Sequence, residues 1–265
     1  PVGQLIFILS ILAGKWGLPA VVVMKAIYAT IHLLGLAAIT QCLKVEHRSR
    51  VLTFYGLNPL VITEGIGNLH AEVVMVGFLF VAFWLFKKSK SVASALFFAL
   101  AVAAKLLPLM FLPLLWSLSK DKGKWMAYVV FFIGLIFIPF FWMYYAGGFV
   151  DSLDLYFRKF EFNAGLYYVL RWVGRAITGY NLIQWLGPML ALLALGAILK
   201  VSLKSRWLVV RGTSVAELGF VIVLLFLFSL TTLHPWYLIL PLAVSAFTQF
   251  RFLWIWSYLI TWTYI

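Results

Sequence analysis

The segment LNPLVITEGIGNLHAE, at positions 57–72, holds the residues best suited to chemistry: Glu64, Asn68, His70 and Glu72. The surrounding chain is mostly apolar, and ionisable groups at membrane depth are costly unless they face a bundle interior or a wet cavity. Two carboxylates beside a histidine offer a general base and acid, or ligands for a divalent cation. The structural alternative makes Glu72 a partner for a helix dipole and Glu64 a hydrogen-bonded acid.

We therefore predict an active site here, with Glu64, His70 and Glu72 as catalytic groups and Asn68 as a substrate ligand. The interruption by Pro59, Gly65 and Gly67 supports this interpretation, because broken backbone at membrane depth needs protein or water to satisfy it. A divalent metal is chemically possible, but we predict no cofactor because no ligand spacing requires one.

A second ionisable group, Lys105, lies in AVAAKLLPLMFLPLL with apolar residues on both sides. A buried ammonium needs an anionic partner. A phosphate is one candidate, since lysine binds phosphate as a point charge. A snorkelling side chain, or an ion pair with Glu64 or Glu72, is the alternative. We predict that Lys105 binds an anionic substrate.

The segment 147–180 is polar and aromatic. Its apolar residues recur at a helical spacing that predicts an amphipathic interfacial helix, starting with Leu153, Tyr156, Phe157 and Phe160. The other interpretation is that its polar side chains meet a charged headgroup near the cavity: Arg158, Lys159, Glu161, Asn163, Arg171 and Arg175. We count Arg158, Glu161, Asn163 and Arg171 as candidate substrate ligands.

The last candidate group is HPWY, at His234 to Tyr237, where one apolar run ends and another begins. Proline suits the first turn of a helix. Trp236 and Tyr237 could simply belong to an interfacial aromatic belt. Because His234 titrates near neutral pH, we include His234, Trp236 and Tyr237 among the candidate substrate ligands.

The amino-acid composition indicates that these groups lie in a membrane protein. The 265 residues are 65% hydrophobic and 11% charged, with a mean hydropathy of +1.04, whereas soluble domains carry about 25% charged residues. The apolar runs are continuous, unlike the short alternating segments of membrane β-barrels. Cys42 is the only cysteine, which excludes an intrachain disulfide. We predict an all-α, polytopic transmembrane bundle that forms a single domain over residues 1–265.

The charge of +13 indicates topology rather than nucleic-acid binding. Most of the 21 Lys and Arg residues fall in five short segments between apolar runs: 44–50, 87–90, 119–124, 200–211 and Arg251. Basic short loops stay in the cytoplasm. The segment 64–72, Lys105, the 147–180 loop and HPWY then all lie on the outer side. We predict one extracytoplasmic cavity, bounded by re-entrant breaks in short paired helices like those of transporters.

Four stretches together resemble the GT-C superfamily of integral-membrane glycosyltransferases: LNPLVITEGIGNLHAE, AVAAKLLPLMFLPLL, FEFNAGLYYVLRW and LHPWYLILPLA. The likeness is nearest to bacterial mannosyltransferase-like members that use polyprenyl-phosphate sugars. The resemblance extends from about Pro1 to Val244. It depends on the order of the four motifs and on their predicted location on the same side of the membrane.

The resemblance implies inversion at a sugar carbon by direct displacement from a lipid-phosphate donor. It implies donor-phosphate binding by Lys105 with Arg158 or Arg171, and a lipid-side entrance shaped by HPWY. It also implies that a pocket for acceptor or donor is lined by Glu64, Asn68, His70 and Glu72. The usual base lies in a first outer loop, so we expect this chain to lack its N-terminal helix and that loop.

We expect an enzyme of the bacterial inner (plasma) membrane that moves a mannose-like hexose from a polyprenyl phosphate to an acceptor outside. The acceptor would be a lipid, a glycan or a protein, with membrane lipid and other membrane proteins as further partners and no nucleic acid. The alternative is a transporter, a flippase or a non-catalytic subunit of a membrane complex. A transporter should show an inverted repeat, and the paired hairpins here show no convincing one.

Overall fold

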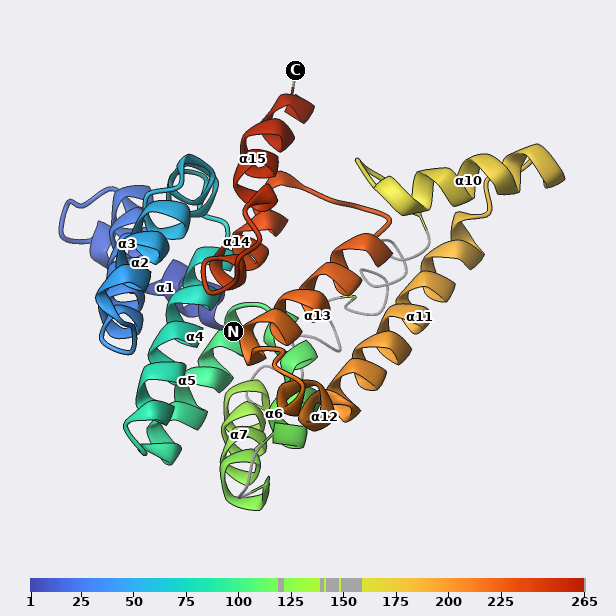
Figure 1. The fold of residues 1–265 in the computed structure, drawn as a ribbon. Helices are drawn as coiled ribbons and strands as arrows, with labels where there is room; N and C mark the ends of the chain where they lie inside the picture. Colours follow the sequence, from blue (N-terminus) through green and yellow to red (C-terminus); the bar gives the residue numbers. More distant parts are fainter. Residues whose placement is uncertain (119–121, 139–140, 142–147, 149–158, 265) are drawn as a thin grey trace.

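The computed structural model describes residues 1–118, 122–138, 141, 148 and 159–264, and each regular element in this part of the chain is a helix, as predicted (Figure 1). The helices are α1 (Val2–Gly14), α2 (Ala20–Thr40), α3 (Val45–Val51), η1 (Leu52–Gly56), η2 (Val61–Gly67), α4 (Glu72–Lys87), α5 (Ser91–Ala104), η3 (Leu107–Phe111), α6 (Leu112–Leu118), α7 (Lys122–Phe137), α10 (Gly165–Thr178), α11 (Ile183–Leu203), α12 (Ser205–Val210), α13 (Val215–Ser229), η5 (Pro235–Leu238), α14 (Ile239–Ser245), α15 (Phe252–Leu259) and η6 (Ile260–Tyr264).

Two described helices, α2 and α11, are long and apolar enough to cross a membrane, each with 21 residues. A third span arises if η2 and α4, which meet at a bend of 101°, count as one broken helix. The exposed positions of α2 and α11 include large apolar side chains such as Leu33 and Leu192, which suit lipid rather than water. These two or three apolar helices fit a membrane protein.

The core is built around α4, which packs against α2 on one side and α5 on the other. Where α2 crosses α4, Gly35 and Gly77 bring the two backbones into contact. An added Cβ at Gly35 would lie 2.7 Å from the Cα of Gly77, and one at Gly77 would lie 2.8 Å from the carbonyl oxygen of Ile31. Small residues permit such close crossings in membrane bundles.

We expect Gly77→Ala to destabilise the fold by about 1–3 kcal/mol, because the new methyl group overpacks a backbone contact that cannot yield. The measurement is the thermal unfolding midpoint in detergent. Gly196→Ala in α11 is the matched control, since the described residues leave open space around its Cβ. A Gly77→Ala midpoint no lower than that of the control would refute the crossing.

The predicted helix breaks are present. η2 ends at Gly67 and α4 begins at Glu72, and Leu69 between them has φ of 60°, which is rare for a bulky residue and typical of constrained functional sites. Lys105 is extended between α5 and η3. Pro235 opens η5 after α13 has ended.

In the described part of the 147–180 segment the amphipathic helix is α10, which begins after Phe160, the last residue of the predicted helical spacing. Leu153, Tyr156 and Phe157 fall outside the described residues, and Phe160 lies before α10 in non-helical chain. The exposed apolar side chains of α10 recur along one stripe: Leu166, Val169, Trp172, Val173 and Ile177. Gly179, with φ of 78°, ends the helix in the left-handed conformation.

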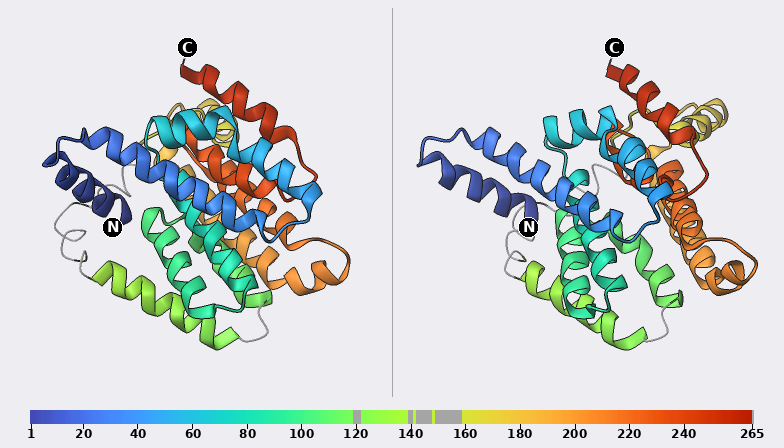
Figure 2. Two further views of the ribbon diagram at one scale, coloured as in Figure 1. Left: turned by 90° about the vertical axis from the view of Figure 1, so that its left-hand side faces the viewer. Right: turned by 60° about the vertical axis from the view of Figure 1, so that its left-hand side comes forward.

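Figure 1 shows where several helix ends lie in the molecule. In Figure 1 the basic α4–α5 turn and α12 lie toward the lower end, whereas α10 and the C-terminal end of α15 lie toward the upper end. Figure 2 shows α1 and α2 as an antiparallel pair at one edge in both views. The basic α3 lies in the upper half of the same view, so the predicted sidedness of the loops stays a prediction.

Candidate functional site

Glu64 lies in η2, a π-helix whose wider turn is typical of functional positions. Its side chain is nearly buried, and Oε2 of Glu64 lies 3.3 Å from Nε2 of His70. The backbone also joins the two residues, because the His70 N–H donates to the Glu64 carbonyl at 3.2 Å. The break after η2 therefore turns the chain so that His70 folds back onto Glu64.

Glu72 is the first residue of α4, and it forms an ion pair with Nζ of Lys105. The Glu72 side chain is 2% exposed and the Lys105 side chain 28% exposed. Nζ of Lys105 also lies 4.5 Å from the centre of the Tyr237 ring, which is within cation–π range. Of the interpretations open from the sequence, the ion pair with Glu72 is the one observed, and a substrate contact for Lys105 stays a prediction.

An aromatic stack joins three of the separate sequence segments. The ring of His70 stacks on Trp236 at 3.7 Å between centroids, and Trp236 stacks on His234 at 4.4 Å. His234 in turn stacks on Phe162 at 5.0 Å. Flat rings packed at these separations give each other a fixed orientation, so the break after η2, the 160–163 segment and HPWY form one site.

Phe162 is a member of this stack that the sequence interpretation missed, although the quoted motif FEFNAG contains it. Its backbone is fixed by two hydrogen bonds: its N–H donates to the Thr231 carbonyl at 3.0 Å, and the Leu233 N–H donates to its carbonyl at 2.8 Å. An aromatic residue between polar neighbours was the only sequence signal. The pairing with residues 231–233 is long-range and left no local trace.

Glu161 and Arg171 form a second polar cluster, in which they bind each other. The Glu161 carboxylate also accepts hydrogen bonds from the Tyr167 hydroxyl and from Nδ2 of Asn181, the latter at 3.3 Å. Burial raises the pKa of Glu161, but the hydrogen bonds from Tyr167 and Asn181 and the charge of Arg171 outweigh it, so the pKa lies below its usual value. Glu161 is therefore ionised at neutral pH.

The remaining predicted ligands lie apart from these contacts. Asn68 ends η2 with an exposed side chain. Asn163 has φ of 49° and its Nδ2 lies 3.5 Å from the Leu233 carbonyl; its role as a substrate ligand stays a prediction. Arg158 lies outside the described residues.

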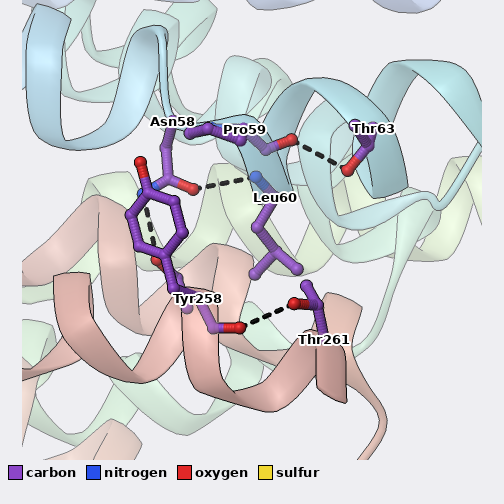
Figure 3. Close-up of a pocket in the computed structure, with 7 residues that line it drawn as sticks. Asn58, Pro59, Leu60, Thr63, Tyr258 and Thr261 are labelled. Atoms are coloured by element: carbon purple, nitrogen blue, oxygen red, sulfur yellow. Dashed lines mark hydrogen bonds between the residues drawn. The ribbon is translucent and has the colours of Figure 1, made fainter. Parts of the chain in front are cut away.

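Two small cavities are lined by residues of the described chain. One of about 200 Å³ lies between the 58–63 segment and α15–η6, lined by uncharged side chains that include Asn58, Thr63 and Tyr258 (Figure 3). In it the Asn58 amide already donates to Ser257 and accepts from the Leu60 N–H. The other, of about 180 Å³, is bounded by Asn163, Leu233, Trp256 and neighbours. Asn163 is the one predicted site residue that lines either cavity.

The arrangement offers a paired carboxylate and imidazole, a partly exposed ammonium and a wall of stacked rings. Such a set can accept a proton, balance an anion and present the edges of stacked rings to a ligand. Within the described residues no group of three or more His, Cys, Asp or Glu side chains is arranged to hold a metal ion.

Residues 6–119 match the family model described as "Alpha-(1->6)-mannopyranosyltransferase, N-terminal domain". The matched part contains Glu64, His70, Glu72 and Lys105 but neither α10 nor HPWY. Comparisons with curated proteins and with solved structures gave no match. The family match supports glycosyltransferase activity of the mannosyltransferase kind, with a sugar donor and an acceptor as substrates.

Proposed function

We propose that the chain is a multi-pass membrane glycosyltransferase of GT-C type, which transfers a mannose-like hexose from a polyprenyl-phosphate donor to an acceptor on the extracytoplasmic face of the bacterial inner membrane. One observation carries the proposal: ionisable side chains from separate helix breaks meet in one cluster, whose N-terminal half lies in the part matched to a mannosyltransferase family.

The reaction that fits these groups is a direct displacement. An acceptor hydroxyl attacks the anomeric carbon of the donor, a base takes the hydroxyl proton, and the bond to the phosphate oxygen breaks. Glu64 is the described carboxylate best suited to take the proton, because Glu72 is committed to Lys105. His70, 3.3 Å from Glu64, holds that carboxylate in place.

The departing phosphate needs a cation. Lys105 supplies it, since its side chain remains partly exposed and its ammonium lies beside Glu72 and the Tyr237 ring. Glu72 orients the Lys105 ammonium before the donor arrives. Trp236 and His234, stacked between His70 and Phe162, present their ring edges to the sugar or the lipid, and the exposed apolar stripe of α10 lies in the membrane interface.

The test is transfer by the full-length protein in detergent or nanodiscs, with radiolabelled polyprenyl-phosphate mannose as donor and α-mannosides as acceptors. We expect a labelled, extended glycan. Absence of both transfer and donor hydrolysis with a panel of polyprenyl-phosphate hexoses would end the proposal.

The bent pair of η2 and α4 also favours a second candidate function, that of a transporter or flippase, because discontinuous helices also form transporter sites. A transporter or flippase would move a labelled lipid or solute across proteoliposomes and leave its covalent structure unchanged. The same labelled donor therefore separates the two classes in one experiment.

A further inference from the structure

We propose that Glu161 is a positioning residue rather than a substrate ligand: it holds the 160–163 segment in place and so fixes the aromatic stack of Phe162, His234 and Trp236. The inference deepens the proposed function and depends on it for its kinetic test. This role takes the place of a direct contact between Glu161 and a charged headgroup, which the sequence alone left open beside a structural role.

Glu161 is bound from three places. Its carboxylate accepts from Tyr167 in the first turn of α10, from Arg171 one turn later, and from Asn181 beyond the end of the helix. Both carboxylate oxygens are thus engaged within the protein. A carboxylate held in this way is suited to tie the 160–163 segment to α10 and is poorly suited to receive a ligand.

The next residue transmits the constraint. Phe162 follows Glu161 directly, and its N–H and carbonyl are bonded to Thr231 and Leu233. The centroid of its ring lies 5.0 Å from that of the His234 ring, on which it stacks. A shift of Glu161 therefore moves the ring that supports one side of His234.

From His234 the contacts are continuous to the proposed base. Trp236 lies between His234 and His70 at 4.4 Å and 3.7 Å, and His70 lies 3.3 Å from Glu64. The stack thus links α10, with its lipid-facing stripe, to the carboxylate that would take the acceptor proton.

Tyr167 separates positioning from direct binding, because its side chain is fully buried and cannot touch a substrate. Tyr167→Phe removes only the hydroxyl, which contacts Glu161 and also Oδ1 of Asn181 at 3.1 Å. We expect kcat to fall roughly tenfold with the KM for the donor unchanged, since displacement of reacting groups by about 1 Å costs up to about 10²-fold. Tyr180→Phe, at an exposed tyrosine beyond α10, is the matched control and should leave kcat unchanged.

A double variant tests the route. If Tyr167 acts through the stack, then in a His234→Ala background Tyr167→Phe should lower kcat by less than about twofold, because coupled residues are not additive. Full multiplication of the two losses would overturn the proposal. So would a Glu161→Gln variant that raises the donor KM at unchanged kcat.

A readout independent of activity keeps the two proposals separate. The fluorescence emission of Trp236 is the difference between a protein that has Trp236 and the same protein with Trp236→Phe. We expect acrylamide to quench this emission more strongly in Tyr167→Phe than in the wild type. Unchanged quenching would refute the positioning role even if transfer is observed. If the wild type transfers no sugar, the proposed function fails and quenching alone decides the role of Glu161.

Discussion

Glu64→Gln is expected to lower kcat for sugar transfer by about 10²–10⁴-fold, the usual worth of a general base. Glutamine keeps the shape of the side chain and can still contact His70, but it cannot accept a proton from the acceptor hydroxyl. The Glu64 side chain is 7% exposed, so an isosteric change leaves the packing around it intact. The measurement is single-turnover transfer from a labelled polyprenyl-phosphate mannose.

The matched control is Glu217→Gln, the same chemical change at the N-terminus of α13. Glu217 there forms a capping box with Ser214, and a glutamine can form the same hydrogen bonds. Transfer by Glu217→Gln should equal that of the wild type. Wild-type transfer by Glu64→Gln would remove Glu64 as the base and direct attention to residues outside this chain segment.

The sequence predicted the helix breaks well because their signals are local. Gly67, Pro108 and Pro235 interrupt apolar runs, and glycine and proline end helices for reasons of backbone geometry alone. The π-helical form of η2 was not predictable, because the sequence does not distinguish its hydrogen-bond register from that of an α-helix. Of the residues whose spacing predicted an amphipathic helix, only Phe160 can be compared, and it lies in non-helical chain before α10.

The site was predictable as a set of residue types but not as a set of pairs. The cost of charge at membrane depth selected Glu64, Glu72 and Lys105, yet which acid pairs with Lys105 depends on how η2 and α4 meet. The stacking of Trp236 between two histidines depends on the relative placement of three helix breaks. Such long-range packing leaves no periodicity in the chain, which is why Phe162 was missed.

Lys105→Met is expected to destabilise the protein by about 3 kcal/mol and to abolish transfer, because it leaves the Glu72 carboxylate buried without its partner. Glu72 is 2% exposed, so water cannot replace the lost ammonium. Methionine preserves the apolar stem of the lysine and isolates the effect of the charge. The measurements are the unfolding midpoint in detergent and the rate of transfer.

The double variant Lys105→Met with Glu72→Gln separates stability from catalysis. Removing both charges should restore most of the lost stability, since an absent ion pair costs far less than a broken one. Transfer should stay absent in the double variant, because no described cation then replaces Lys105 beside the Tyr237 ring to balance the departing phosphate. If transfer returns with stability, Lys105 serves the fold alone and the phosphate is bound elsewhere.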